Sequence, residues 1–316
     1  MASSTFAKVE LDLIRTLEAL DFNLYVNTPD TGRVLLLEKG RTLDQDTKLR
    51  LSRKKAEIYI LNQERENYRR HLEEGLRRLL RTEPLDEAKA AVLAYDMSLQ
   101  AVEAVFENPD KETLKKAQGS FAATAELILT KERALFALLE LTRNSHQLHV
   151  HSANVAIFGL GLARNLIMEG QEINLRNFSS ALFFHDLGQI SMGPNLIGRM
   201  GDLSPEEFAQ VREHPAIGLE LLGEAGFLTP EASVVIGQHH ERLDGSGYPR
   251  GLKGEEIDLL ARICAIADVY DVLTSDLYAH NHKDGQSAIM YMVSKMTGQF
   301  DGPLLRRFIE MFRQAA

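Results

Sequence analysis

The 316-residue sequence has little cysteine, since Cys264 is the only one. A single cysteine cannot form an internal disulfide, and it excludes the usual zinc sites built from several thiolates. Any metal that this chain binds must therefore be held by histidine, aspartate and glutamate side chains.

Long apolar segments are also missing. The longest candidate, residues 155–168, is interrupted by Arg164 and Asn165, whereas crossing a bilayer takes roughly 20 apolar residues. The start of the chain lacks the basic and then apolar pattern of a signal peptide. We therefore expect a cytoplasmic protein without a membrane segment.

Basic residues are fewer than acidic ones in this sequence. The chain has 36 lysines and arginines against 45 acidic residues, a formal net charge of −9. This balance argues against non-specific binding of DNA or RNA, which depends on cations placed near phosphates. Hydrophobic residues make up 44% of the sequence, enough for a sizeable core, and the length favours two domains.

The N-terminal part of the chain carries strand signals. Residues 22–26 and 33–37 predict the two strands of a hairpin, because the proline, aspartate and glycine between them are typical of a turn. Residues 57–60 predict a third strand. We therefore expect a small sheet here.

Helical patterns flank the third strand. Residues 46–55 have helix composition, and residues 64–81 follow a helical period with one apolar face. That face consists of Tyr68, Leu72, Leu76 and Leu79. The sequence thus predicts a small α/β module at residues 1–82, with a role in regulation or in dimer formation rather than in catalysis.

From residue 83 onward the strand signals disappear. Glycine and proline breaks divide the remaining sequence into segments with helical spacing, and two helices are expected to meet near Thr130. The predicted fold class is therefore mainly α, with a helical second domain at residues 83–316.

His185 and Asp186 end an apolar helical run at residues 179–184, which would carry them into the interior. A buried aspartate must be paired or bound to a metal, and histidine supplies a nitrogen ligand that manganese, iron and zinc accept. One carboxylate can also bridge two metals. The alternative for this dipeptide alone is a helix end with local hydrogen bonds.

Three further segments bring potential ligands inward. His239 and His240 follow another apolar helical run, Asp268 lies among small apolar residues, and His214 stands beside a helix break. Neighbouring residues on a helix point about 100° apart, so His239 and His240 would serve different metals or ligands. Four such segments favour a two-metal site over separate core histidines.

Residues 239–249, HHERLDGSGYP, followed by residues 250–257, resemble the signature of the HD-GYP phosphodiesterases. The likeness covers a core at residues 145–312. Its other parts are His151-Ser152 with Val155, the motif His185-Asp186-Leu187-Gly188, residues 203–207 and 214–218, and residues 262–268 with Asp271.

This resemblance implies a helical HD-type metallohydrolase domain with two divalent metals, commonly iron or manganese. Asp186 would bridge them. Carried over residue by residue, the ligands would be His151, His185, Asp186 and Asp268 for one metal, and Asp186, His214, His239 and His240 for the other.

The resemblance also implies a substrate, the bacterial second messenger cyclic di-GMP, which such enzymes cut to pGpG and sometimes to GMP. It implies catalytic roles for Asp186 and for the position of Gln189. The GYP loop would form a wall of the substrate cleft and a surface for diguanylate cyclase domains. Its expected substrate contacts are Gly247, Tyr248, Pro249 and Arg250.

The chain departs from the family pattern at three places. Gln189 stands where the HDxGK motif has lysine, residues 274–280 lack two arginines that usually follow, and Gln147 replaces the glutamate that holds a third metal in some members. Two metals are therefore expected. Nearby cations that could take the place of the missing ones are Arg242, Arg250 and Lys253.

These departures leave two alternatives to a cyclic di-GMP phosphodiesterase. One is a metal-bound receptor or scaffold with weak catalysis, which binds a nucleotide or a diguanylate cyclase. The other is a metallophosphohydrolase of a different nucleotide, because two metals and a cleft do not specify a base.

Overall fold

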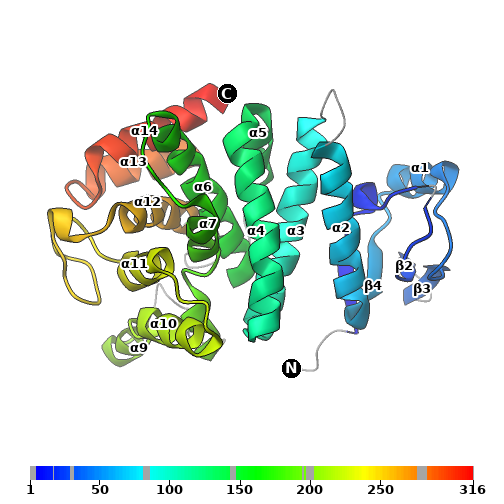
Figure 1. The fold of residues 1–316 in the computed structure, drawn as a ribbon, viewed down its shortest axis with the longest axis horizontal. Helices are drawn as coiled ribbons and strands as arrows, with labels where there is room; N and C mark the ends of the chain where they lie inside the picture. The colour runs from blue at the N-terminus through cyan, green and yellow to red at the C-terminus, as the bar shows by residue number, and fades with distance from the viewer. Residues whose placement is uncertain are drawn as a thin grey trace. The chain divides into compact units, whose positions relative to one another are not determined.

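The computed structural model describes residues 5–16, 18–28, 32–80, 86–142, 147–193, 196, 203–275 and 283–315. These residues are mostly helical and include one small sheet (Figure 1). The prediction of a mainly α fold with a small α/β module is confirmed.

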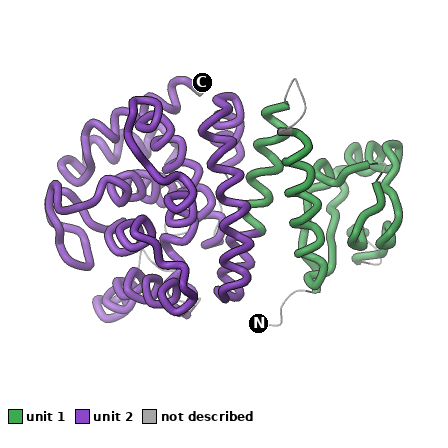
Figure 2. The backbone as a smooth tube through the Cα atoms, viewed as in Figure 1, with its two compact units in different colours: residues 1–100 green, residues 101–316 purple. Residues whose placement is uncertain are grey.

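The chain divides into two units, residues 1–100 and residues 101–316 (Figure 2). The domain boundary expected between residues 82 and 83 lies outside the described ranges. The predicted seven ligands all belong to the second unit.

The first unit contains a four-stranded antiparallel sheet in the order β1-β4-β2-β3. Its elements are β1 (Phe6–Val9), η1 (Leu11–Leu13), β2 (Leu24–Thr28), β3 (Gly32–Leu37), α1 (Gln45–Arg53), β4 (Ile58–Leu61), η2 (Asn62–Glu64), α2 (Arg65–Leu80) and the first part of α3 (Glu87–Glu107).

The predicted hairpin is confirmed, since β2 pairs with β3 from Leu24 opposite Leu37 to Thr28 opposite Gly32. Its tip, residues 29–31, lies outside the described ranges. The third predicted strand is β4. The sequence analysis missed β1, because Ala7 and Val9 alone form its buried face and two positions are too few to show a period.

The predicted helix at residues 64–81 is confirmed as α2. Tyr68, Leu72 and Leu76 are buried, as the apolar face requires. The hydroxyl group of Tyr68 donates a hydrogen bond of 3.0 Å to Asp96 of α3, which satisfies this buried polar group.

Within its described residues, the second unit consists of helices joined by loops and contains no strand. Its elements are α4 (Lys111–Thr130), α5 (Glu132–Leu141), α6 (Leu148–Met168), α7 (Leu175–Phe183), η3 (Leu187–Ser191), α9 (Pro205–Val211), α10 (His214–Ala225), α11 (Pro230–Gln238), η4 (Gly254–Glu256), α12 (Leu259–Thr274), α13 (Gly285–Lys295) and α14 (Gly302–Ala315). The helix junction expected near Thr130 is thus confirmed.

Helix α6 forms the centre of this unit. It is apolar almost all round, as a helix covered on every side must be, and it packs against α7 and α12. Gly159 allows a close approach to α7, because a β-carbon there would lie 2.9 Å from Leu182 Cδ2. The helices that carry the predicted ligands are therefore held together by the core.

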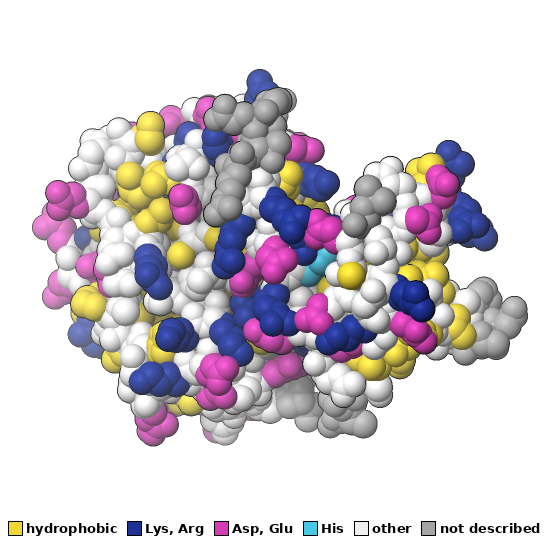
Figure 3. All heavy atoms as spheres, turned by 45° about the vertical axis from the view of Figure 1, so that its right-hand side comes forward, with side chains coloured by type: hydrophobic (Ala, Val, Ile, Leu, Met, Phe, Trp, Pro, Cys, Tyr) yellow, Lys and Arg dark blue, Asp and Glu magenta, His cyan; other side chains and the backbone are white. Residues whose placement is uncertain are grey.

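The surface is polar and of mixed charge on the face that Figure 3 shows. Lysine and arginine side chains alternate there with acidic ones, and apolar side chains are scattered between them. Within the described ranges, no helix combines the length and the apolarity needed to cross a bilayer.

Candidate metal centre

Five places in the second unit supply the predicted ligands, and the fold brings them together. They are the first turn of α6 (His151), the segment after α7 (His185 and Asp186), the start of α10 (His214), the end of α11 (His239 and His240), and the middle of α12 (Asp268). All are buried except His240, which is partly exposed.

These side chains form two neighbouring clusters, each compact enough to hold a metal ion. One cluster contains Asp186, His214, His239 and His240, and the other contains His151, His185 and Asp268. The division follows the two ligand sets that the family resemblance implied, except that Asp186, implied for both sets, belongs here to the first cluster only.

The carboxylate of Asp186 lies between the clusters. Its Oδ1 is 3.2 Å from Nε2 of His214 and 3.6 Å from Nε2 of His239. Its Oδ2 is 3.4 Å from Nε2 of both His151 and His185. Each oxygen of this one carboxylate thus faces a different group of histidines, which is the arrangement a bridging ligand requires.

Asp268 also faces both clusters. Its Oδ1 lies 3.3 Å from Nε2 of His151, and its Oδ2 lies 3.7 Å from Nδ1 of His240. Two carboxylates therefore stand among five imidazoles.

Backbone carbonyl groups fix the orientation of three of the histidines. The pairs are His185 Nδ1 with Leu182 O at 2.8 Å, His214 Nδ1 with Val211 O at 2.7 Å, and His239 Nδ1 with Ile236 O at 2.9 Å. A carbonyl oxygen can only accept, so each Nδ1 must carry the hydrogen. The Nε2 lone pair of each neutral ring then points toward the carboxylates.

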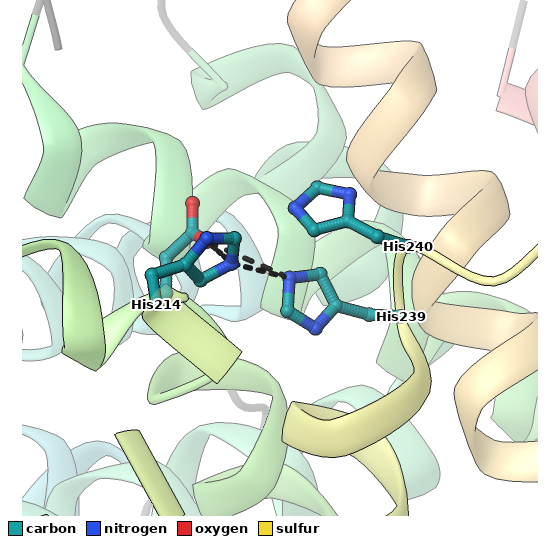
Figure 4. A group of neighbouring side chains, drawn as sticks. His214, His239 and His240 are labelled. Atoms are coloured by element: carbon teal, nitrogen blue, oxygen red, sulfur yellow. Dashed lines mark hydrogen bonds and ion pairs between the residues drawn. The ribbon is translucent and has the colours of Figure 1, made fainter. Parts of the chain in front are cut away.

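This tautomer assignment creates a conflict that a cation resolves. Nε2 of His214 lies 3.2 Å from Nε2 of His239 (Figure 4), yet both nitrogens are acceptors when both rings are neutral. In addition, His185 Nε2, Asp186 Oδ1 and His240 Nε2 are buried without a hydrogen-bond partner in the described part of the chain. Lone pairs turned toward one another from nitrogen and oxygen donors suit manganese, iron or zinc.

The electrostatics of the site differ from one predicted ligand to another. Burial alone would raise the pKa of Asp186, but its interactions with His185, His151 and His214 hold that pKa well below its usual value. Burial and the neighbouring His239 and His214 lower the pKa of His240 well below its usual value. Burial alone would lower the pKa of His151, but its contacts with Asp186, Asp268 and Asp271 raise that pKa well above its usual value. A metal at this cluster would therefore have to displace a proton from His151, whereas Asp186 and His240 are already in the forms that bind metal.

Asp271 is a positioning residue whose role the sequence analysis missed. Its Oδ2 lies 2.7 Å from Nδ1 of His151, and its Oδ1 accepts a hydrogen bond of 2.9 Å from the amide of Asn154. Such a carboxylate orients a histidine ligand and increases its basicity. The signal was in the spacing, since Asp271 follows Asp268 by three residues on one helical face, as Asn154 follows His151.

Asp271→Asn is expected to weaken metal binding at the His151 cluster by about 10-fold to 100-fold, because the amide orients the imidazole less firmly. Metal analysis after dialysis should show the loss of about one metal per chain. Asp258→Asn is the matched control, since it changes the exposed N-cap of the same helix to another good N-cap residue. Equal metal content in the two variants would refute the positioning role.

Gly188 and Gln189 lie directly beyond Asp186 on η3. A β-carbon on Gly188 would lie 1.9 Å from the carbonyl oxygen of His214, so only glycine lets α10 approach this closely. The backbone N–H of Gln189 donates to the carbonyl oxygen of Asp186 at 2.9 Å, and the side chain of Gln189 is buried. Gln189, which stands where the HDxGK motif has lysine, is thus inside the domain, one turn from Asp186.

Tyr248 is the residue of the predicted loop that reaches the site. Its ring stacks on His240, with 4.5 Å between centroids and 28° between planes. Gly247 permits this path, since a β-carbon there would lie 2.4 Å from the carbonyl oxygen of His240. The side chains of Pro249 and Arg250 are exposed.

Glu241 shapes the same loop and was not expected from the sequence. Its carboxylate is buried and accepts hydrogen bonds from the backbone amides of Arg250, at 2.7 Å, and Leu252, at 3.0 Å. Satisfying two amides fixes the turn that carries Tyr248.

The cations that could replace the lysine and arginines of the HD-GYP pattern differ in what their side chains contact. Arg242 donates to the carbonyl oxygens of His239 and Glu241, at 3.1 and 3.0 Å, so it supports the backbone. Lys253 packs its stem against Gly245. Arg212, which the sequence analysis passed over, places its guanidinium 5.0 Å from the ring centroid of Tyr248. Residues 276–280 lie outside the described ranges.

Two kinds of sequence comparison find relatives. The HD domain family matches residues 140–304. A Pseudomonas aeruginosa protein named cyclic di-GMP phosphodiesterase is 34% identical over 183 residues, which are 58% of this chain and 44% of that protein. A Vibrio cholerae protein named 3'3'-cGAMP-specific phosphodiesterase 3 is 36% identical over 129 residues, which are 40% of this chain and 27% of that protein. This chain therefore matches less than half the length of either relative.

A solved structure shares the fold. It is described as an HDG"Y"P protein from Bdellovibrio bacteriovorus, and it matches with a TM-score of 0.72 at 22% sequence identity. The match covers 98% of this chain and 99% of that one.

Proposed function

This chain belongs to the HD domain family, as its resemblance to the HD-GYP proteins predicted, and we propose that its second unit is a metal-dependent phosphodiesterase. The proposed substrate is cyclic di-GMP, cut to linear pGpG, with GMP as the product of a second cleavage. The proposed cofactors are two divalent ions, iron or manganese.

The observation that carries this proposal is the position of Asp186. Each oxygen of this one carboxylate faces a different group of histidines. Without a cation this arrangement would be unfavourable, because buried acceptors would face one another without a hydrogen-bond donor. It is the donor arrangement of a centre that holds two cations side by side.

The protein's contribution to the reaction is placement. His185, Asp186 and Asp268 with His151 would hold one ion, and Asp186 with His214, His239 and His240 the other. When bound, two such ions supply a lowered pKa for an attacking water and positive charge for the phosphate oxygens. Asp271 keeps Nε2 of His151 turned inward, and the ring of Tyr248 covers His240 at the edge of the site.

The GYP loop supplies the remaining parts of the proposal. Tyr248 and Gly247 would form the substrate wall next to the metals. The exposed Pro249 and Arg250 are the side chains available to a diguanylate cyclase domain.

A product assay tests the function directly. The full chain is purified without oxygen, its metal content is measured, and cyclic di-GMP is added while pGpG and GMP are followed by chromatography. We expect conversion to pGpG by protein with about two metals per chain. Fully metallated protein that yields no product would overturn the proposal.

A different cyclic dinucleotide is the second candidate substrate. One relative is named for activity on 3'3'-cGAMP, and bound metals would act on the phosphate of a cyclic dinucleotide rather than on a particular base. Running 3'3'-cGAMP in parallel distinguishes the two, because the preferred substrate will have the larger kcat/KM.

Substitutions of Gln189 distinguish an enzyme from a receptor that binds its ligand without cleaving it. Gln189→Lys is expected to raise the turnover about tenfold, equal to about 1.4 kcal/mol, because the ammonium group would gain a phosphate contact that strengthens in the transition state. The control is Gln189→Met, which has similar length and no charge.

A receptor would give a different pattern. Metallated wild type would bind cyclic di-GMP without product, and Gln189→Lys alone would cleave it slowly. If Gln189→Lys and Gln189→Met have the same affinity and turnover, the residue does not face the phosphate.

A further inference from the structure

A cavity of about 570 Å³ lies within the first unit, far in sequence from the metal ligands. Its walls come from η1, α1, α2 and α3, all inside residues 1–100. A volume of this size is typical of small-molecule sites.

Five apolar side chains line the cavity among polar and charged ones. Leu13, Ile14 and Leu93 are buried, Leu79 is half-buried and Leu49 is exposed. Gly75 adds to the space, because it stands in the middle of α2 where any longer side chain would extend toward Leu93, 3.5 Å from its β-carbon position. Glycine weakens a helix interior, so its presence here is consistent with a need for room.

Two of the cations that line the cavity are lysines, Lys48 and Lys89. Nζ of Lys48 donates to the carbonyl oxygens of Asp12 and Ile14, at 2.8 and 2.7 Å, which leaves one of its three hydrogens for another acceptor. In the described part of the chain, neither Lys48 nor Lys89 forms an ion pair with a carboxylate. Burial and the charge of Lys89 lower the pKa of Lys48, while Asp12 opposes that shift.

The other charged side chains of the cavity are largely balanced. Arg15 forms ion pairs with Glu18, at 3.1 Å, and with Glu74, at 3.0 Å, and Arg78 also pairs with Glu18. Asp12 and Asp46 line the exposed rim. Asp12 acts on Lys48 from beyond ion-pair distance. Within the described residues, the cavity's cations without a carboxylate at ion-pair distance are therefore Lys48, whose stem is half-buried, and Lys89, whose charge acts on Lys48.

We propose that this cavity binds a small amphipathic organic anion, with its acidic group at Lys48 and Lys89 and its apolar part against the leucines. The anion would accept a hydrogen bond from the third hydrogen of the Lys48 ammonium group. Its negative charge would also offset the repulsion between Lys48 and Lys89. This site is independent of the metal centre and gives the first unit a ligand of its own.

A pair of fluorescent probes tests the proposal on the full chain. 8-Anilinonaphthalene-1-sulfonate carries a sulfonate, and N-phenyl-1-naphthylamine has the same rings without the charge. We expect one saturable site for the sulfonate probe and at least a tenfold weaker affinity for the neutral one. Equal affinities, or no saturable binding of the sulfonate probe, would overturn the proposal.

Variants locate the site. Lys48→Met and Lys89→Met should each lower the affinity for the sulfonate probe about tenfold and leave that for the neutral probe unchanged. Gly75→Phe should fill the cavity and abolish binding of both probes. The matched control is Lys54→Met, an exposed residue at the end of the same helix as Lys48.

Thermal melting followed by circular dichroism shows which variants fold. Lys89 is exposed, and among the described residues its ammonium group donates no hydrogen bond to the backbone. Lys89→Met therefore decides the case if Lys48→Met does not fold. The proposal is wrong if the folded lysine variants bind the sulfonate probe as tightly as Lys54→Met does, or if folded Gly75→Phe binds as the wild type does.

Discussion

Asp186→Ala is expected to abolish metal binding at both clusters and to lower the hydrolysis of cyclic di-GMP by at least about 10³-fold, or about 4 kcal/mol of transition-state stabilisation. The reason is geometric. Oδ1 of this side chain faces His214 and His239, while Oδ2 faces His151 and His185, so one truncation removes an oxygen from each cluster. Metal analysis and the product assay measure the two effects.

Two other variants make this result specific. Gln147→Ala, at the N-cap of α6, should keep about two metals per chain, since that residue is expected to hold none. The metal content of Asp271→Asn should lie between those of the other two variants, because this change affects the orientation of one predicted ligand, His151. If Asp186→Ala loses no more metal than Asp271→Asn, Asp186 does not bridge.

Removing the metals from the wild type should lower its melting temperature. The ligands come from α6, α10, α11, α12 and the segment after α7, so only the folded chain brings them together. At free metal about 100 times the dissociation constant, one site contributes about 2.7 kcal/mol, or about 5–10 °C for a domain of this size. Two sites together should approach twice that value.

Melting curves with and without a chelator measure this shift, and metal added back should restore it. Asp186→Ala is the control, because a chain that holds no metal should melt at the same temperature in both buffers. A wild type whose metal is stripped without any change in melting temperature would contradict the site.

The sequence alone determined the kind of fold and the identity of the ligand candidates. Helical periodicity and turn residues are local signals, so α2 and the hairpin of β2 and β3 were predictable. The single cysteine limited the possible metal ligands to histidine, aspartate and glutamate. The position of His185 and Asp186 at the end of an apolar run predicted that this polar pair is buried. Strand β1 was not predicted, because its four residues are too few to show an alternating pattern of apolar and polar side chains.

Only the tertiary structure decided how these residues meet. His151 and Asp271 are 120 positions apart in the chain, and no local pattern says that they share a hydrogen bond or that Asp186 turns one oxygen to each cluster. The stacking of Tyr248 on His240 and the cavity beside Lys48 likewise join distant segments. Such contacts depend on the packing of whole helices, whereas periodicity reports only which face of one helix is buried.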